Sequence, residues 1–197
     1  MRTDVSGYGK LRLLIPAVLI TALCGVLLVM LRSAPAQGGE TITDEYRIKA
    51  AFLYNFAKFV EWPAGAFKDS RSPLVICILG RDPFGAALDE IRDKTVGGRA
   101  IVLKHIKDAG EAENCHILFI SESERESVAQ HVARGVRNRA ILSVGDTRGY
   151  AQKGVVINMI IVNSKVGFEI NIDAAQRAGL MIHSQLLKLA KIIKEKA

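Results

Sequence analysis

The sequence predicts an α/β domain: a three-layer sandwich with a mostly parallel sheet and a C-terminal antiparallel hairpin. Three observations support this fold class. Short, continuously apolar runs alternate with amphipathic segments, which is typical of a parallel sheet covered by helices. Glycine, proline and aspartate mark turns between these segments. Two apolar runs near the C-terminal end are separated only by Asn163-Ser164-Lys165, which favours a hairpin.

A long helix is predicted to open the domain. Thr43 and Asp44 can cap a helix that starts at Glu45, and apolar residues then follow helical spacing. Trp62-Pro63 should end it, because the residue before a proline avoids the helical region.

Four strands are predicted next, each a short apolar run between turn signals. They cover Leu74–Leu79, Ala100–His105, Cys115–Ile120 and Ala140–Val144. Short helices are expected between them, at residues 86–94 and after Ser121.

The hairpin should join residues 155–162 to residues 166–172, with Glu169 facing solvent. A short helix is expected at residues 173–178, ended by Gly179. Ser184 can cap a last helix whose apolar residues pack inward, namely Leu186, Leu187, Ala190 and Ile193.

The first 36 residues have the three parts of a secretory signal peptide: a basic start, the apolar block Leu13–Leu31 and the motif Ala34-Pro35-Ala36. Cleavage is predicted between Ala36 and Gln37. Residues 1–36 are then the signal peptide, residues 37–43 a flexible N-terminus and residues 44–197 a single domain. The block is nearly long enough to cross a bilayer, so a retained N-terminal inner-membrane anchor is the alternative.

Removal of this leader changes the charge and the cysteine count. The formal net charge of +7 becomes +4, because the leader holds four Lys or Arg and one Asp. This modest charge is spread without a cluster, so nucleic acid is not an expected partner. Cys24 leaves with the leader, and an even pair in an oxidising compartment, Cys77 and Cys115, favours one disulfide. Two buried free thiols are the alternative.

No catalytic or metal-binding pattern is found in the sequence: there is no GxSxG, HExxH or P-loop, and the four histidines lack ligand spacing. We therefore predict no enzyme, no metal and no cofactor. The best candidates for a polar ligand or partner site are Arg81 and Asp82 after the first strand and Asp146 and Arg148 after the fourth. Ligands in open α/β sheets favour these carboxyl ends, although solvated loop charges are the alternative.

The N-terminal helix carries more aromatic residues than one face can bury. Most should belong to the core, and any on the outer face would form an interaction patch. Tyr54 and Trp62 are the candidate interaction aromatics.

Several separated blocks of the chain resemble the YfiR family of periplasmic bacterial proteins. The blocks are Lys49–Pro63, Leu142–Asp146, Phe168–Ala175, Gly179-Leu180 and Ser184–Ala190, and together the similarity covers residues 44–194.

The resemblance implies a periplasmic signalling protein that binds an inner-membrane diguanylate cyclase, or a similar sensor kinase, through its periplasmic domain. Repression of this receptor would lower cyclic-di-GMP and biofilm formation, and an OmpA-like outer-membrane lipoprotein could sequester the repressor. The resemblance also implies a homodimer and a Cys77–Cys115 disulfide. A second cysteine pair of some relatives is absent here. The alternative function is a periplasmic small-ligand-binding module without catalysis, built on the loops around Arg81 and Arg148.

Overall fold

The computed structural model describes residues 38–124, 126–136 and 138–194, and the described residues from Glu40 onward belong to one compact unit. The predicted signal peptide and its cleavage site between Ala36 and Gln37 lie outside the described residues. Among the described helices, none has the length and apolarity needed to cross a membrane.

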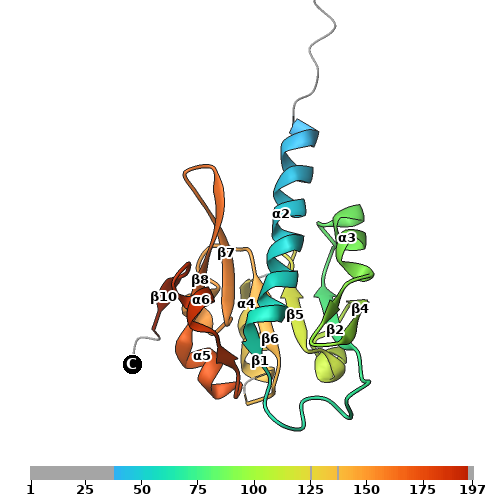
Figure 1. The fold of residues 1–197 in the computed structure, drawn as a ribbon. Coiled ribbons are helices and arrows are strands. Elements are labelled where there is room, and N and C mark those ends of the chain that lie inside the picture. The colour runs from blue at the N-terminus through green and yellow to red at the C-terminus, as the bar shows by residue number, and fades with distance from the viewer. Residues whose placement is uncertain (1–37, 125, 137, 195–197) are drawn as a thin grey trace, which may run out of the picture. The chain divides into compact units, whose positions relative to one another are not determined.

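An eight-stranded sheet forms the middle layer (Figure 1), with the strand order β10-β8-β7-β6-β5-β2-β4-β3. Neighbouring strands are parallel except in the pairs β7–β8 and β3–β4. The prediction of a mostly parallel sheet with a C-terminal antiparallel hairpin is therefore confirmed. The strands are β2 (Leu74–Leu79), β3 (Thr95–Val96), β4 (Arg99–Ile106), β5 (Ile117–Ile120), β6 (Leu142–Gly145), β7 (Ile157–Val162), β8 (Lys165–Asn171) and β10 (Lys191–Ile193).

Helices cover both faces of this sheet, as expected for a three-layer sandwich. Strand alternation separates two buried clusters, because successive side chains point to opposite faces. In β2, for example, Ile76 packs in the cluster of α2, whereas Cys77 packs in the cluster of α4. One face carries α2 (Gly38–Phe59), η1 (Gly85–Leu88) and α3 (Asp89–Arg92), and the other carries η2 (Ala109–Asn114), α4 (Glu126–Gly135) and η3 (Ala151–Lys153).

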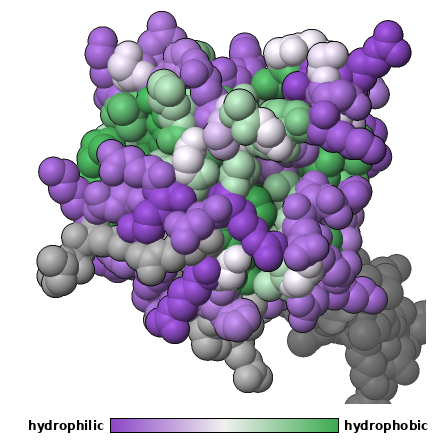
Figure 2. All heavy atoms as spheres, turned by 90° about the horizontal axis from the view of Figure 1, so that it is seen from below, coloured by the Kyte–Doolittle hydropathy of each residue, from purple (hydrophilic) through white to green (hydrophobic). Residues whose placement is uncertain are grey.

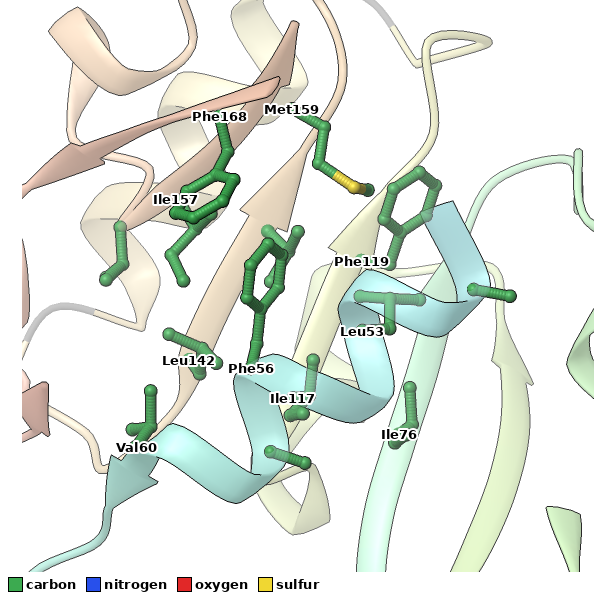
Figure 3. Packing of buried hydrophobic residues seen from close by; sticks show 14 of the residues in the cluster. Leu53, Phe56, Val60, Ile76, Ile117, Phe119, Leu142, Ile157, Met159 and Phe168 are labelled. Atoms are coloured by element: carbon green, nitrogen blue, oxygen red, sulfur yellow. The ribbon is translucent and has the colours of Figure 1, made fainter. Parts of the chain in front are cut away.

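The larger core lies between α2 and the sheet (Figure 3). Leu53 and Phe56 of α2 are fully buried against strand residues such as Ile117. Phe168 of β8 makes edge-to-face contacts with Phe52 and Phe56, at centroid distances of 5.4 and 5.2 Å. These contacts fix the long helix across the sheet. On the face seen from below Figure 1, green apolar patches alternate with purple polar side chains (Figure 2).

A second, two-stranded sheet closes the end of α2. It pairs β1 (Val60–Glu61) with β9 (Met181–Ile182) in antiparallel register, Val60 opposite Ile182. Between β8 and β9 lies the short helix α5 (Ile172–Arg177), which Asn171 caps through a hydrogen bond from the Ala174 amide.

Helix α2 starts earlier than the sequence predicts. It begins at Gly38 rather than Glu45, so residues 38–43 are helical where a flexible segment is expected. The cap signal at Thr43-Asp44 is overridden, and two glycines at a helix terminus cost less than glycines in its interior.

The predicted last helix is wrong beyond its first turn. Helix α6 (Ser184–Leu187) has His183 at its N-cap position without a side-chain capping hydrogen bond, and the chain then forms β10, which pairs in parallel with β8. The edge of β8 offers unpaired backbone groups, and pairing with them outweighs the local helical spacing. The hairpin is therefore not the edge of the sheet. Leu186 is buried as expected, but Leu189 is exposed.

Candidate functional site

Asp146, which directly follows β6, is part of a buried polar cluster with helix α2. Its Oδ2 accepts hydrogen bonds from Lys49 Nζ at 2.8 Å and from the Tyr46 hydroxyl at 3.0 Å. The side chains of Lys49 and Asp146 are only 5% and 0% exposed. Lys49 Nζ also lies 2.6 Å from Glu45 Oε1. The cluster thus joins α2 to the carboxyl end of a central strand.

The helical spacing explains why these side chains meet. Residues three and four positions apart share one helix face, so Glu45, Tyr46 and Lys49 all approach the end of β6. Burial, followed by the negative charge of Asp146, raises the pKa of Tyr46 well above its usual value. The phenol therefore stays a neutral donor, and the cluster anchors α2 electrostatically.

The loop after β2 is held by its own polar groups. Asp82 Oδ1 accepts a hydrogen bond from the Phe84 amide at 2.7 Å, and its Oδ2 lies 2.8 Å from His105 Nε2. The backbone amide of Arg81 donates to Ser123 Oγ at 2.9 Å, while the Arg81 side chain is exposed. Arg148 is exposed as well. The structure therefore builds Asp146 into the α2 cluster and uses Asp82 to shape a turn.

The two candidate interaction aromatics, Tyr54 and Trp62, are partly buried against the larger core. The Tyr54 hydroxyl donates to the Thr95 carbonyl at 3.3 Å, and two lysine ammonium groups, of Lys58 and Lys94, lie 5.4 and 5.0 Å from its ring centre. The Trp62 ring packs edge-on against Phe67 at 6.1 Å. Both rings therefore have partners within the domain.

A stack of side chains holds the loop between β1 and β2. Phe67 lies flat on His116 with ring centres 4.1 Å apart, and the Arg99 guanidinium carbon lies over the Phe67 ring, 3.9 Å from its centre. His116 Nδ1 accepts from the Val75 amide at 3.0 Å, so Nε2 carries the proton and donates to the Ala66 carbonyl at 3.2 Å. Burial lowers the pKa of His116. The sequence gives no signal for this stack, because its members are far apart in the chain.

The predicted disulfide between Cys77 and Cys115 is confirmed. Cys77 lies in β2 and Cys115 two residues before β5, and their Cα atoms are 5.8 Å apart. This distance suits a disulfide bond. The bond ties two neighbouring strands together within the buried cluster under α4, and the alternative of two free thiols is wrong.

Two cavities are described, and neither is lined by Arg81, Asp82, Asp146 or Arg148. The larger, about 740 Å³, lies among α4, η3, α5 and β10. The smaller, about 640 Å³, lies beside Cys115 and His116. Within the described ranges, no three His, Cys, Asp or Glu residues are grouped so that they could hold a metal ion.

Residues 46–191 match the YfiR/HmsC-like family model, which spans the chain from α2 to the start of β10. The chain belongs to the YfiR/HmsC-like family. The match contains the Tyr46–Lys49–Asp146 cluster and both cysteines of the disulfide. The YfiR/HmsC-like family is known for periplasmic regulation of cyclic-di-GMP signalling, which points to a regulatory protein and not to a catalyst.

Proposed function

We propose that the protein is a periplasmic repressor of an inner-membrane diguanylate cyclase or a similar sensor kinase. It binds the receptor's periplasmic domain and lowers cyclic-di-GMP output. Membership of the YfiR/HmsC-like family over residues 46–191 is the observation that carries this proposal. The proposed signal peptide, residues 1–36, delivers the protein to the periplasm. A homodimer is the proposed state, and an OmpA-like outer-membrane lipoprotein the proposed sequestering partner.

The β7–β8 hairpin supplies a surface suited to such a partner (Figure 1). Strand β6 pairs with β7 only at Ile157 and Asn158, and β10 pairs with β8 only from Glu169 onward. Residues 159–168 thus form a two-stranded ribbon that reaches past both neighbouring strands. Near its tip, Ile161 and Val162 are 51% and 49% exposed.

The physical requirement of repression is modest. The repressor must bind the inactive receptor state more tightly than the active one, and each factor of ten in this preference corresponds to about 1.4 kcal/mol. Burial of exposed apolar side chains such as Ile161 on the inactive state can contribute such a difference. Binding alone therefore suffices for the proposed role.

The proposal is tested with the purified periplasmic domain of a diguanylate cyclase from the same genome, with a sensor-kinase domain in parallel. Binding is expected, together with higher cyclic-di-GMP when the gene is deleted. The double variant Ile161→Asp/Val162→Asp should weaken binding at least tenfold. Leu189→Asp, at a site 75% exposed, is the matched control and should not. Circular dichroism checks that both variants are folded.

Absence of binding to either domain, with unchanged cyclic-di-GMP after deletion, would refute the repressor. Binding that the hairpin variant leaves intact would retain the repressor and move its contact surface away from Ile161 and Val162.

A small-ligand-binding module without catalysis is the second candidate function. The 740 Å³ cavity favours it, since small-ligand pockets usually measure about 300–1,000 Å³. The loops around Arg81 and Arg148 are not part of this cavity. A thermal-shift screen of periplasmic metabolites tests this function, which predicts a ligand that stabilises the protein at a single site.

A further inference from the structure

The walls of the larger cavity come from several segments that are far apart in the sequence. Its apolar lining includes Val136 after α4, Ile141 before β6, Val156 before β7 and Ala174 of α5. Ser143 and Gln152 add polar groups to the same lining. Apolar walls with a few polar side chains are typical of a small-ligand site.

Four basic side chains converge on this cavity. Arg134 comes from the last turn of α4, Lys153 from the end of η3, Arg177 from the end of α5 and Lys194 from the residue after β10. None of the described residues that line the cavity is acidic. The lining thus brings four positive charges together although they are up to 60 positions apart in the sequence.

The acidic residues nearby offset only part of this charge. Lys153, Asp173 and Arg177 each already have an interaction within the protein. Even if Asp173, which lies on the same helix as Arg177, is counted against the four cations, a net charge of +3 remains. Helix-dipole stabilisation would account for Arg134 at the end of α4, but not for Lys194, which follows a strand.

Glu169 lies behind this lining and is already neutralised. The sequence predicts that Glu169 faces solvent, yet it is only 5% exposed, so that prediction is wrong. Its Oε1 accepts a hydrogen bond from Lys191 Nζ at 2.9 Å, and its Oε2 lies 3.5 Å from Gln152 Nε2. Strand β10, which the sequence predicts as helix, brings Lys191 to this position. Because Glu169 is paired with Lys191, its charge is not available to offset the cations of the lining.

We propose that the cavity among α4, η3, α5 and β10 binds a small organic anion that carries phosphate or clustered carboxylate groups. Arginine guanidinium groups bind such oxyanions in bidentate geometry, and lysine ammonium groups add point charges. The bound anion would bridge α4, η3, α5 and β10. This inference deepens the second candidate function and does not depend on the repressor.

The experiment uses protein purified from cells that express the full-length gene. Isothermal titration calorimetry measures binding of inorganic pyrophosphate and of citrate, which represent the phosphate and carboxylate sources of the same chemistry. One saturable site per chain is expected for at least one probe. Arg134→Gln and Lys194→Gln should each weaken it at least tenfold. Arg139→Gln is the control, because Arg139 lines the other cavity.

A second measurement places the site independently of the variants. In amide NMR spectra, the tighter probe should shift Gly154 and Ala178, which line the cavity, and leave Gly65, which lines the other cavity, in place. Binding that is absent, that does not saturate, or that Arg134→Gln and Lys194→Gln leave unchanged would overturn the inference. Capture of the cyclase domain is measured on the same variants, so that loss of anion binding is distinguished from failure of the repressor proposal.

Discussion

Lys49 Nζ lies 2.8 Å from Asp146 Oδ2, and this buried ion pair joins residues 97 positions apart in the chain. It connects the long helix α2 to the end of the central strand β6. The hydroxyl of Tyr46 donates a hydrogen bond to the same carboxylate oxygen. Family membership identifies the kind of protein, but this contact shows how helix α2 is held.

Removal of one partner of the Lys49–Asp146 ion pair should lower the free energy of unfolding, because it leaves the charge of the other partner buried without its counter-charge. Lys49→Met removes the cation and leaves Asp146 Oδ2 with only the hydrogen bond from the Tyr46 hydroxyl, of the two described above. We expect a loss of about 3–5 kcal/mol in the free energy of unfolding. Urea denaturation monitored by circular dichroism measures it.

The control is Arg92→Ala, which removes the exposed ion pair with Asp89 on α3. Exposed pairs contribute less than about 1 kcal/mol, so this variant should be close to the wild type. Equal losses in the two variants would show that the buried pair is not the anchor of α2.

The disulfide should contribute stability through the unfolded chain. Its two cysteines are separated by 38 positions, so the chain-entropy relation gives about 4 kcal/mol. The double variant Cys77→Ala/Cys115→Ala should lose about this amount in urea denaturation. Dithiothreitol should destabilise the wild type and leave the variant unchanged, whereas an equal effect on both would contradict this account.

His116 should make stability depend on pH below its ordinary pKa. Burial lowers the pKa of the folded His116 below 6.5, so the unfolded state binds more protons as pH falls. The stabilisation is fully present above pH 6.5 and is lost as pH falls from there through the lowered folded pKa. Denaturation series from about pH 7.5 to about pH 5 should show this loss at up to about 1.4 kcal/mol per pH unit.

The comparison is His116→Gln, which cannot titrate. Its free energy of unfolding should fall less steeply over the same pH range, whatever its value at neutral pH. Parallel pH curves for the two proteins would assign the acid sensitivity to other groups.

Gly145, the last residue of β6, should not tolerate even a methyl group. A Cβ there would lie 2.6 Å from Tyr150 Cδ2 and 3.3 Å from Asn158 Oδ1. Tyr150 is fully buried and cannot move aside. Gly145→Ala should therefore cost about 1–3 kcal/mol in the free energy of unfolding.

Gly135→Ala provides the matched glycine control, because a Cβ there meets no atom of the described residues within 4 Å. Gly135 ends α4, where alanine is the better helix former, so stability should be unchanged or higher by up to about 1 kcal/mol. A similar loss in both variants would mean that overpacking against Tyr150 is not the cause.

Local patterns predicted the central strands well. The predicted bounds of Leu74–Leu79 agree with β2 at both ends, because this strand is buried on both faces and its sequence is apolar throughout. The even cysteine count in an oxidising compartment predicted the Cys77–Cys115 bond. These features are visible because each depends on a short stretch or on a simple count.

Other features depend on partners that local patterns cannot identify. The apolar residues up to Ile193 follow helical spacing, yet Lys191–Ile193 form a strand because they pair with the edge of β8. Strand alternation places the Glu169 side chain on the opposite side of β8 from Phe168 and Ile170. That side is not open to solvent, because Gln152 of η3 and Lys191 of β10 contact Glu169 there. In both places tertiary contacts outweigh local preference.

The sequence by itself determined the fold class, the disulfide and the resemblance that the family match confirmed, since each is encoded in apolar periodicity, composition or ordered motifs. Only the tertiary structure decided that Lys49 neutralises Asp146, and that four cations from separate elements line one cavity. The physical reason is that charge interactions act over a few ångströms in space, between side chains whose distance along the chain carries no information about their contact.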